Sequence, residues 1–289
     1  MKVGILHNRV TWEIKRLIEE LEKSNIAFEI INNQNIYFRL SKEKDLEFQF
    51  DLILERSLSY FRGLYSCAIL ETKGYKVLNN FECLNITGNK LLTSLKLIEN
   101  NIPTPNTYFA FKEDASMQAI DEGLHYPAII KPIIGSWGRL IAKLEDQNSA
   151  RSNLECRETM GNILQKQYYL QEYLSSTDPK SPTDIRVFVV GDDCVAAMGR
   201  YNPEEDFRSN IALGGTAKKE EITDEIRKIS LNASKAVNGE IVGVDLMVKN
   251  GKFYVIEVNG TPQFRAVSKA SKINVANKIV DYIIRNYKK

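Results

Sequence analysis

Three oxygen-bearing side chains near the C-terminus stand in segments that otherwise have the hydrophobic character of core strands. Glu257 and Asn259 interrupt the run "YVIEVNGTPQFR" (residues 254–265), and Asp245 interrupts "IVGVDLMV" just before it. Carboxylate and amide oxygens are the ligands that a hard divalent cation requires. The sequence therefore predicts a β-hairpin that carries a cation site. Two solvated carboxylates on an edge strand are the alternative.

The turn of this hairpin decides whether Asp245 and Glu257 share a face. A two-residue turn at Asn250 and Gly251 places them on opposite faces, whereas a three-residue loop, residues 249–251, places both on the face of Asn259. We predict the three-residue loop, because it gathers the oxygen ligands. Without a cation the two carboxylates would repel each other, and the pKa of at least one would be raised.

Lys90 is expected in the first turn of a helix that Thr87 or Asn89 caps. A cation there opposes the helix dipole by roughly 0.3 to 1 kcal/mol, unless the helix N-terminus and the lysine share a ligand anion. A solvated lysine is the alternative. The expected apolar stripe of this helix consists of Leu91, Leu92, Leu95 and Ile98.

Lys131 belongs to the strand pattern "YPAIIKPIIG", where it shares a face with Ile129 and Ile133. Burying an unpaired ammonium there would cost on the order of several kcal/mol. Lys131 therefore requires an anionic partner or an edge position. The following turn, residues 135–139, exposes N–H groups to which phosphate oxygens could bind, although it matches neither a Walker loop nor a nucleophile elbow. Arg186, which shares a strand face with Asp184 and Phe188, also requires an anion.

The first eighty-odd residues alternate strands at 2–8, 27–32, 51–57 and 75–80 with helices near 12–24 and 60–73, which predicts a small parallel α/β unit. No G-x-G-x-x-G follows the first strand. His7 and Arg9 lie at the C-terminal end of that strand, where open α/β sheets bind ligands, or they are ordinary loop residues.

Composition places few limits on function. The 289 residues are 43% hydrophobic and 26% charged with a net charge of +2, which is typical of a globular protein and gives no sign of a nucleic-acid footprint. Four scattered cysteines without a C-x-x-C pair suggest a reduced cytoplasm rather than a zinc or disulfide framework. The N-terminus has no signal-peptide or membrane-span pattern.

The stretches "KPIIGSWGRLIAK", "QEYL", "DIRVFVVGD", "SNIALGG" and "EVNGTPQFR" together resemble the ATP-grasp superfamily of carboxylate–amine ligases. The resemblance is to its RimK-like branch, and most closely to the LysX and ArgX group that acts on the carrier protein LysW. It implies an α/β (α+β) fold of three domains, at residues 1–86, 87–172 and 173–289, with ATP between the central and C-terminal domains.

The same resemblance implies roles for single residues. ATP would be bound by Lys90, Lys131, Ser136, Trp137, Gly138, Gln171, Glu172 and Tyr173. Two Mg²⁺ ions would be bound by Asp245, Glu257 and Asn259. Arg186 and Asn210 would be catalytic. The amino-acid substrate would lie near Arg200, Arg208, Gly214, Gly215 and Arg265.

The implied activity is that of a cytoplasmic ligase of arginine or lysine biosynthesis. ATP would activate the side-chain carboxylate of the C-terminal glutamate of LysW as an acyl phosphate, which the amino group of glutamate or α-aminoadipate would attack. Leu213 favours glutamate, whereas Gln263 and Ala266 depart from the usual pattern. A homodimer or homotetramer is expected. The alternatives are a RimK-type ligase acting on a ribosomal protein or on a pterin or deazaflavin cofactor, and an ATP-binding module without ligation.

Overall fold

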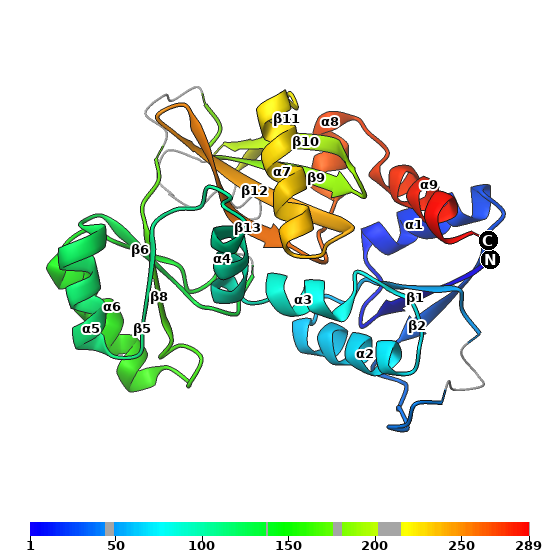
Figure 1. Ribbon diagram of the computed structural model, residues 1–289, viewed down its shortest axis with the longest axis horizontal. Helices are drawn as coiled ribbons and strands as arrows, with labels where there is room; N and C mark the ends of the chain where they lie inside the picture. Colours follow the sequence, from blue (N-terminus) through cyan, green and yellow to red (C-terminus); the bar gives the residue numbers. More distant parts are fainter. Residues whose placement is uncertain (44–48, 137, 176–180, 202–214, 289) are drawn as a thin grey trace.

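The computed structural model describes residues 1–43, 49–136, 138–175, 181–201 and 215–288 and contains three sheets, which we number in chain order. The third sheet lies between the other two along the molecule (Figure 1). The first is parallel, in the order β2-β1-β3-β4, and the other two are antiparallel. Helices accompany all three sheets. The mixed α/β fold class that the sequence predicted is therefore confirmed.

The first sheet confirms the predicted parallel unit at the N-terminus. Its helix α1 begins after Thr11, whose side chain accepts a hydrogen bond from the backbone N–H of Ile14, and α2 is followed by Gly74 at a φ of 78°. These are usual start and stop signals of helices. The elements are β1 (Lys2–His7), α1 (Trp12–Lys23), β2 (Ala27–Asn32), β3 (Leu52–Glu55), α2 (Tyr60–Thr72), β4 (Val77–Leu78) and α3 (Phe81–Thr87).

The second sheet has the order β5-β8-β6-β7 and a separate core. Met117 and Leu154 of its helices pack against Ile130 and Leu170 of its strands. The elements are β5 (Thr107–Ala110), α5 (Glu113–Ala119), the π-helical turn η1 (Ile120–Leu124), β6 (Ala128–Lys131), β7 (Ala142–Leu144), α6 (Gln147–Met160) and β8 (Tyr168–Glu172).

The third sheet has the order β11-β10-β9-β12-β13 and is covered on both faces. Ile226 and Ala233 of α7 pack on one face, and Val267 of α8 and Ile279 of α9 pack on the other. The elements are β9 (Asp184–Val190), β10 (Asp193–Tyr201), β11 (Thr216–Lys219), α7 (Asp224–Ala236), β12 (Ile241–Lys249), β13 (Lys252–Asn259), α8 (Arg265–Ser271) and α9 (Val275–Tyr287).

Helix α4 (Lys90–Glu99) begins after Asn89, whose side chain caps it, but the predicted apolar stripe is wrong. Leu95 and Ile98 are exposed, at 46% and 56%, and the buried face consists of Thr93, Ser94 and Leu97. The two hydroxyl groups can be buried because both are hydrogen-bonded, Thr93 to the backbone oxygen of Ile86 and Ser94 to Tyr169.

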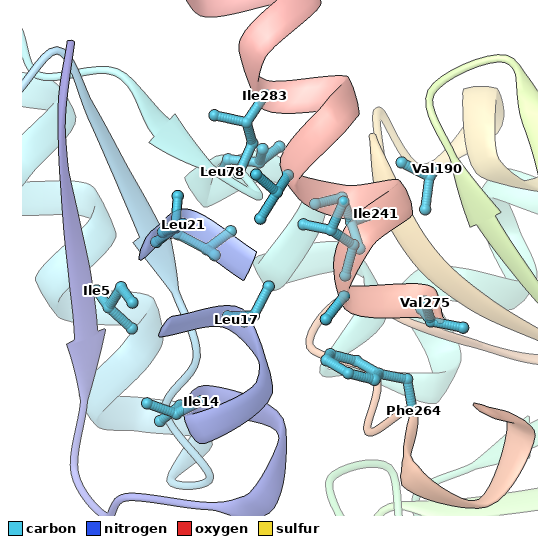
Figure 2. Packing of buried hydrophobic residues seen from close by; sticks show 14 of the residues in the cluster. Ile5, Ile14, Leu17, Leu21, Leu78, Val190, Ile241, Phe264, Val275 and Ile283 are labelled. Carbon is cyan, nitrogen blue, oxygen red and sulfur yellow. The ribbon is translucent and has the colours of Figure 1, made fainter. Parts of the chain in front are cut away.

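The first and third sheets share one hydrophobic core. Figure 2 shows Leu17 and Leu21 of α1 facing Ile283 of α9, with Phe264 below them. The Phe264 ring lies 5.9 Å from that of Trp12 and 5.9 Å from that of Phe188. The N-terminal and C-terminal segments are thus joined by apolar packing. No helix in the described part of the chain has the length and apolar character needed to cross a membrane.

Candidate functional site

The hairpin between β12 and β13 turns in two residues, so the predicted three-residue loop is wrong. Lys249 pairs with Lys252, and Asn250 and Gly251 between them have φ angles of 52° and 74°. Two successive positive φ values define a type I′ turn, which Asn-Gly favours because its twist matches that of the strands.

A β-bulge nevertheless brings the predicted carboxylates to one face. The register runs regularly to Leu246 opposite Val255 and then shifts, so that Ile256 is the extra residue and Asp245 lies directly opposite Glu257. Asn259 pairs with Gly243, two positions further along, and therefore shares their face. The predicted grouping is confirmed, although the bulge and not the loop produces it.

Asp245 is almost fully buried and is held by two arginines. Arg186 donates from Nε and Nη2 to its two oxygens, at 2.7 and 2.6 Å, and Arg200 Nη2 lies 3.0 Å from Oδ2. Burial alone would raise the pKa of Asp245, but the two guanidiniums outweigh it and lower the pKa to about 2. The expected anion beside Arg186 is confirmed. The pKa of Asp245 is lowered, whereas the sequence predicted that repulsion would raise the pKa of at least one of Asp245 and Glu257.

Asp184, for which no role was predicted from the sequence, completes this buried network. It accepts a hydrogen bond from Nε of Arg200 and is 1% exposed. Burial raises the pKa of Asp184 although Arg200 opposes the rise. Its position two residues before Arg186 on one strand face was the available signal. Arg200, a predicted substrate residue, uses its guanidinium within the protein.

Lys90 and Glu257 bring α4 and β13 together. Lys90 Nζ donates to Oε1 of Glu257 at 3.0 Å and to the backbone oxygen of Gly135 at 3.1 Å. A pocket opens here, lined by Lys90 and Glu257 together with Gly135, Ser136 and Gly138 of the predicted glycine turn. The lysine, the acidic hairpin and this turn therefore meet in space, as the sequence predicted.

Lys131 lies on β6, between β7 and β8, and donates to Oε1 of Gln171 at 2.6 Å. Its hydrogen-bond partner is a neutral amide, and the anions that the sequence argument requires are the carboxylates of Glu257 and Asp245, which act on the ammonium through their charge. Burial, and then repulsion by Lys90, lower the pKa of Lys131 to about 8. Gln171 is the one described hydrogen-bond partner of this ammonium.

The other predicted residues divide between the site and its surroundings. Glu172 lies at the end of β8 with Oε2 3.2 Å from Lys249 Nζ, and the Tyr173 ring lies 4.6 Å from Lys143 Nζ. Arg265 is exposed, and its backbone N–H donates to Glu13. Gly215 precedes β11. Trp137, Arg208, Asn210, Leu213 and Gly214 lie outside the described residues.

Sequence reasoning missed how the segment after β13 is fixed to the first sheet. Thr261 Oγ1 lies 3.2 Å from Oε2 of Glu55, and buried Arg56 donates to the backbone oxygen of Pro262 at 2.6 Å. These contacts join residues more than two hundred positions apart in the sequence, so no local sequence pattern predicts them. They place the first sheet against the segment that follows Asn259.

The oxygens on the hairpin suit a magnesium ion that is also bound by a ligand. Among the described residues no three His, Cys, Asp or Glu side chains form a metal cluster. The oxygen-bearing side chains on this hairpin face are the carboxylates of Asp245 and Glu257 and the amide of Asn259. Mg²⁺ is usually held by one or two carboxylates plus phosphate oxygens and water rather than by a complete protein cage. Three cationic side chains already touch these carboxylates, which shows that the face favours positive charge.

Comparisons with known proteins agree with this geometry. Residues 87–283 match the RimK-like ATP-grasp domain, and residues 3–86 match the LysX preATP-grasp domain. The glutamate–LysW ligase ArgX of Sulfurisphaera tokodaii is 33% identical over an alignment of 290 positions, which covers 100% of this chain and 100% of its own. The α-aminoadipate–LysW ligase LysX of Saccharolobus solfataricus is 32% identical over 93% of this chain and 96% of its own.

A solved structure shows the same fold. The ATP-grasp ligase PsnB, in complex with a minimal precursor, Mg and ADP, superposes with a TM-score of 0.75 at 18% identity, over 99% of this chain and 97% of that one. The chain belongs to the RimK-like ATP-grasp family, as its motifs predicted, and it is an ATP-dependent ligase.

Proposed function

We propose that this ligase joins the amino group of glutamate, or of α-aminoadipate, to the side-chain carboxylate of the C-terminal glutamate of LysW. The observation that carries the proposal is the meeting of Lys90, Glu257 and the glycine turn in one pocket. Cation, carboxylate and exposed backbone N–H groups at one place suit a nucleotide triphosphate with its metal. The full-length similarity to LysW ligases supplies the acceptor.

The nucleotide would lie between the second and third sheets. Lys90 and Lys131 would bind its phosphates, residues 136–138 would cover them, and the chain at Glu172 and Tyr173 would contact the adenine. Asp245, Glu257 and Asn259 would hold Mg²⁺, with two ions proposed, which neutralises phosphate charge when bound. The same proposal includes a division into three domains, with boundaries after residues 86 and 172. It also includes a cytoplasmic location and assembly as a homo-oligomer.

The chemistry needs charge stabilisation more than a strong base. A carboxylate oxygen attacks the γ-phosphorus, ADP leaves, and the amine then attacks the acyl carbon, losing a proton and expelling phosphate. Arg186 uses Nε and Nη2 on Asp245, so the two Nη1 hydrogens have no partner in the described chain and can face the developing oxyanion. The bidentate pair fixes the guanidinium before substrate arrives, which reduces reorganisation during the reaction. Asn210 is proposed beside it.

The test is ADP release by the purified protein with purified LysW and each amino acid, with the adduct measured by intact mass. We expect a mass gain of one glutamyl residue on LysW, in preference to an α-aminoadipyl residue. No mass gain on LysW with either amino acid, together with turnover on a pterin, deazaflavin or ribosomal-protein acceptor, would replace this proposal by the alternative. The alternative acceptors are included because Gln263 and Ala266 depart from the usual pattern of the LysW ligases.

Glu257→Gln tests the metal role. We expect loss of Mg²⁺-dependent ADP release by a factor of about a hundred or more, because the amide keeps one oxygen but loses the negative charge that attracts the cation. The variant should remain folded, since Glu257 is partly exposed. Glu99→Gln is the matched control, because Glu99 is an exposed carboxylate paired with Lys96 on the same helix as Lys90. Activity of Glu257→Gln near that of the control would contradict the metal assignment.

A further inference from the structure

A chain of buried hydrogen bonds ends on Lys131. Lys131 Nζ donates to Gln171 Oε1 at 2.6 Å, and Gln171 Nε2 donates to Thr107 Oγ1 and to the Tyr169 hydroxyl, each at 3.0 Å. The Tyr169 hydroxyl lies 2.7 Å from Ser94 Oγ. Gln171 and Tyr169 are each 2% exposed. A buried polar chain of this kind has few alternative arrangements, because each unmade bond is costly.

The neighbours of Gln171 fix which way its amide points. Thr107 uses its own hydroxyl hydrogen on the backbone oxygen of Pro105 at 2.8 Å, so its oxygen is left to accept from Gln171. Turning the amide over would direct an NH₂ group at the ammonium of Lys131 and a carbonyl oxygen at Thr107, which has no hydrogen left to give. The oxygen of Gln171 is therefore held toward Lys131.

A neutral partner has a different electrostatic consequence from a carboxylate. An amide oxygen fixes the direction of the ammonium and leaves its whole charge available to a ligand anion, whereas a carboxylate would neutralise it. The charged groups around Lys131 are Lys90 on α4, Asp245 on β12 and Glu257 on β13. Of these, Asp245 is already matched by two arginines and Glu257 by Lys90.

The far end of the chain lies on the helix that carries Lys90. Ser94 is one turn after Lys90 on α4 and is 6% exposed. The bonds from Ser94 through Tyr169 and Gln171 thus fix Lys131 of the second sheet relative to α4. Two lysines that are 41 positions apart in sequence are thus held in one arrangement by hydrogen bonds within the protein.

We propose that Gln171 is a positioning residue for ATP binding: its amide oxygen, aimed by Thr107 and Tyr169, holds the Lys131 ammonium in the direction of the nucleotide phosphates without neutralising it. The inference rests on the proposed nucleotide role of Lys131, and it gives the Gln171 side chain a function separate from contact with adenine.

The test is a double-mutant cycle on Mg–ATP binding, measured by calorimetry without carrier or amino acid. Lys131→Met should weaken binding by roughly a hundredfold, and Gln171→Met by roughly tenfold, which corresponds to one hydrogen bond to a charged group. The double variant should bind within about threefold of Lys131→Met, because Gln171 acts through Lys131. Gln118→Met, at an exposed glutamine on α5, is the matched control and should bind as the wild type does.

Gln171→Glu separates positioning from packing. The side chain keeps its size, but its carboxylate would pair with the ammonium, so ATP affinity should fall by roughly tenfold and the KM for ATP should rise more than kcat falls. This arm decides the matter if Gln171→Met does not fold. The positioning role would be overturned if Gln171→Glu binds ATP as tightly as the wild type. It would also be overturned if the double variant binds ATP tenfold more weakly than Lys131→Met alone. Wild-type affinity in Lys131→Met would instead refute the nucleotide role of Lys131, and binding without ligation would count against the LysW proposal alone.

Discussion

The first and second sheets are attached to the third in different ways. The first sheet shares a continuous apolar core with it, through Leu17, Leu21 and Phe264, and this packing excludes water (Figure 2). The second sheet has its own core, and it meets the third sheet through the polar contact of Lys249 on β12 with Glu172 on β8. The candidate site lies at the polar junction, because charged ligands can enter there without disrupting a core.

Phe264→Ala should break the apolar junction and produce the largest effect. Removing a fully buried phenyl ring costs about 3–5 kcal/mol of the free energy of unfolding, because transfer and cavity terms add. Denaturant unfolding measures this loss. Hydrogen exchange should quicken in β1 and α1 as well as in β9 and α9, since the ring joins both sides of the core.

Leu154→Ala tests whether the core of the second sheet is separate from the core that the first and third sheets share. This side chain is also fully buried, so a loss of about 2–5 kcal/mol is expected for that sheet. Its neighbours belong only to the core of the second sheet. Faster exchange should therefore stay within β5 to β8 with α5 and α6. Equal acceleration in α1 or α9 would show that the two cores are not separate.

The pH dependence of ATP binding probes the polar junction. Lys131 has an ordinary pKa of 10.5 that the folded protein lowers to about 8, so folding releases a proton between these values. The cost of burying the charge is full below pH 8 and falls as the pH rises from 8 to 10.5. Phosphate oxygens favour the ammonium, so ATP binding should take up close to one proton at pH 9 and almost none at pH 7. Calorimetry in two buffers of different ionisation enthalpy counts these protons. ATP affinity should fall above pH 8.

Lys249→Ala should have the smallest effect. The ammonium is 39% exposed and its contact with Glu172 is that of a surface ion pair, so the free energy of unfolding should change by no more than about 1 kcal/mol. Salt should reduce even that difference. A change comparable to that of Phe264→Ala would mean that polar contacts, and not cores, hold the second and third sheets together.

Much of the fold and the members of the site could be predicted from local pattern. The alternation of strands and helices identified the parallel unit, and Asn89 and Gly74 marked the start of one helix and the end of another. The predicted apolar stripe of α4 was wrong for a definite reason. Ser94 can be buried because its hydroxyl group is hydrogen-bonded to that of Tyr169, 75 positions away in the sequence. No helical periodicity contains that information.

The sequence by itself determined the chemistry of this protein: which side chains carry oxygen, which carry positive charge, and that their motifs are those of a RimK-like ATP-grasp ligase. Tertiary structure alone decided how those groups are paired. The bulge at Ile256 sets the register in which Asp245 lies opposite Glu257, and the arginines beside Asp245 lower its pKa. Motifs are local, whereas electrostatic energies depend on distances between residues that only the folded chain brings together.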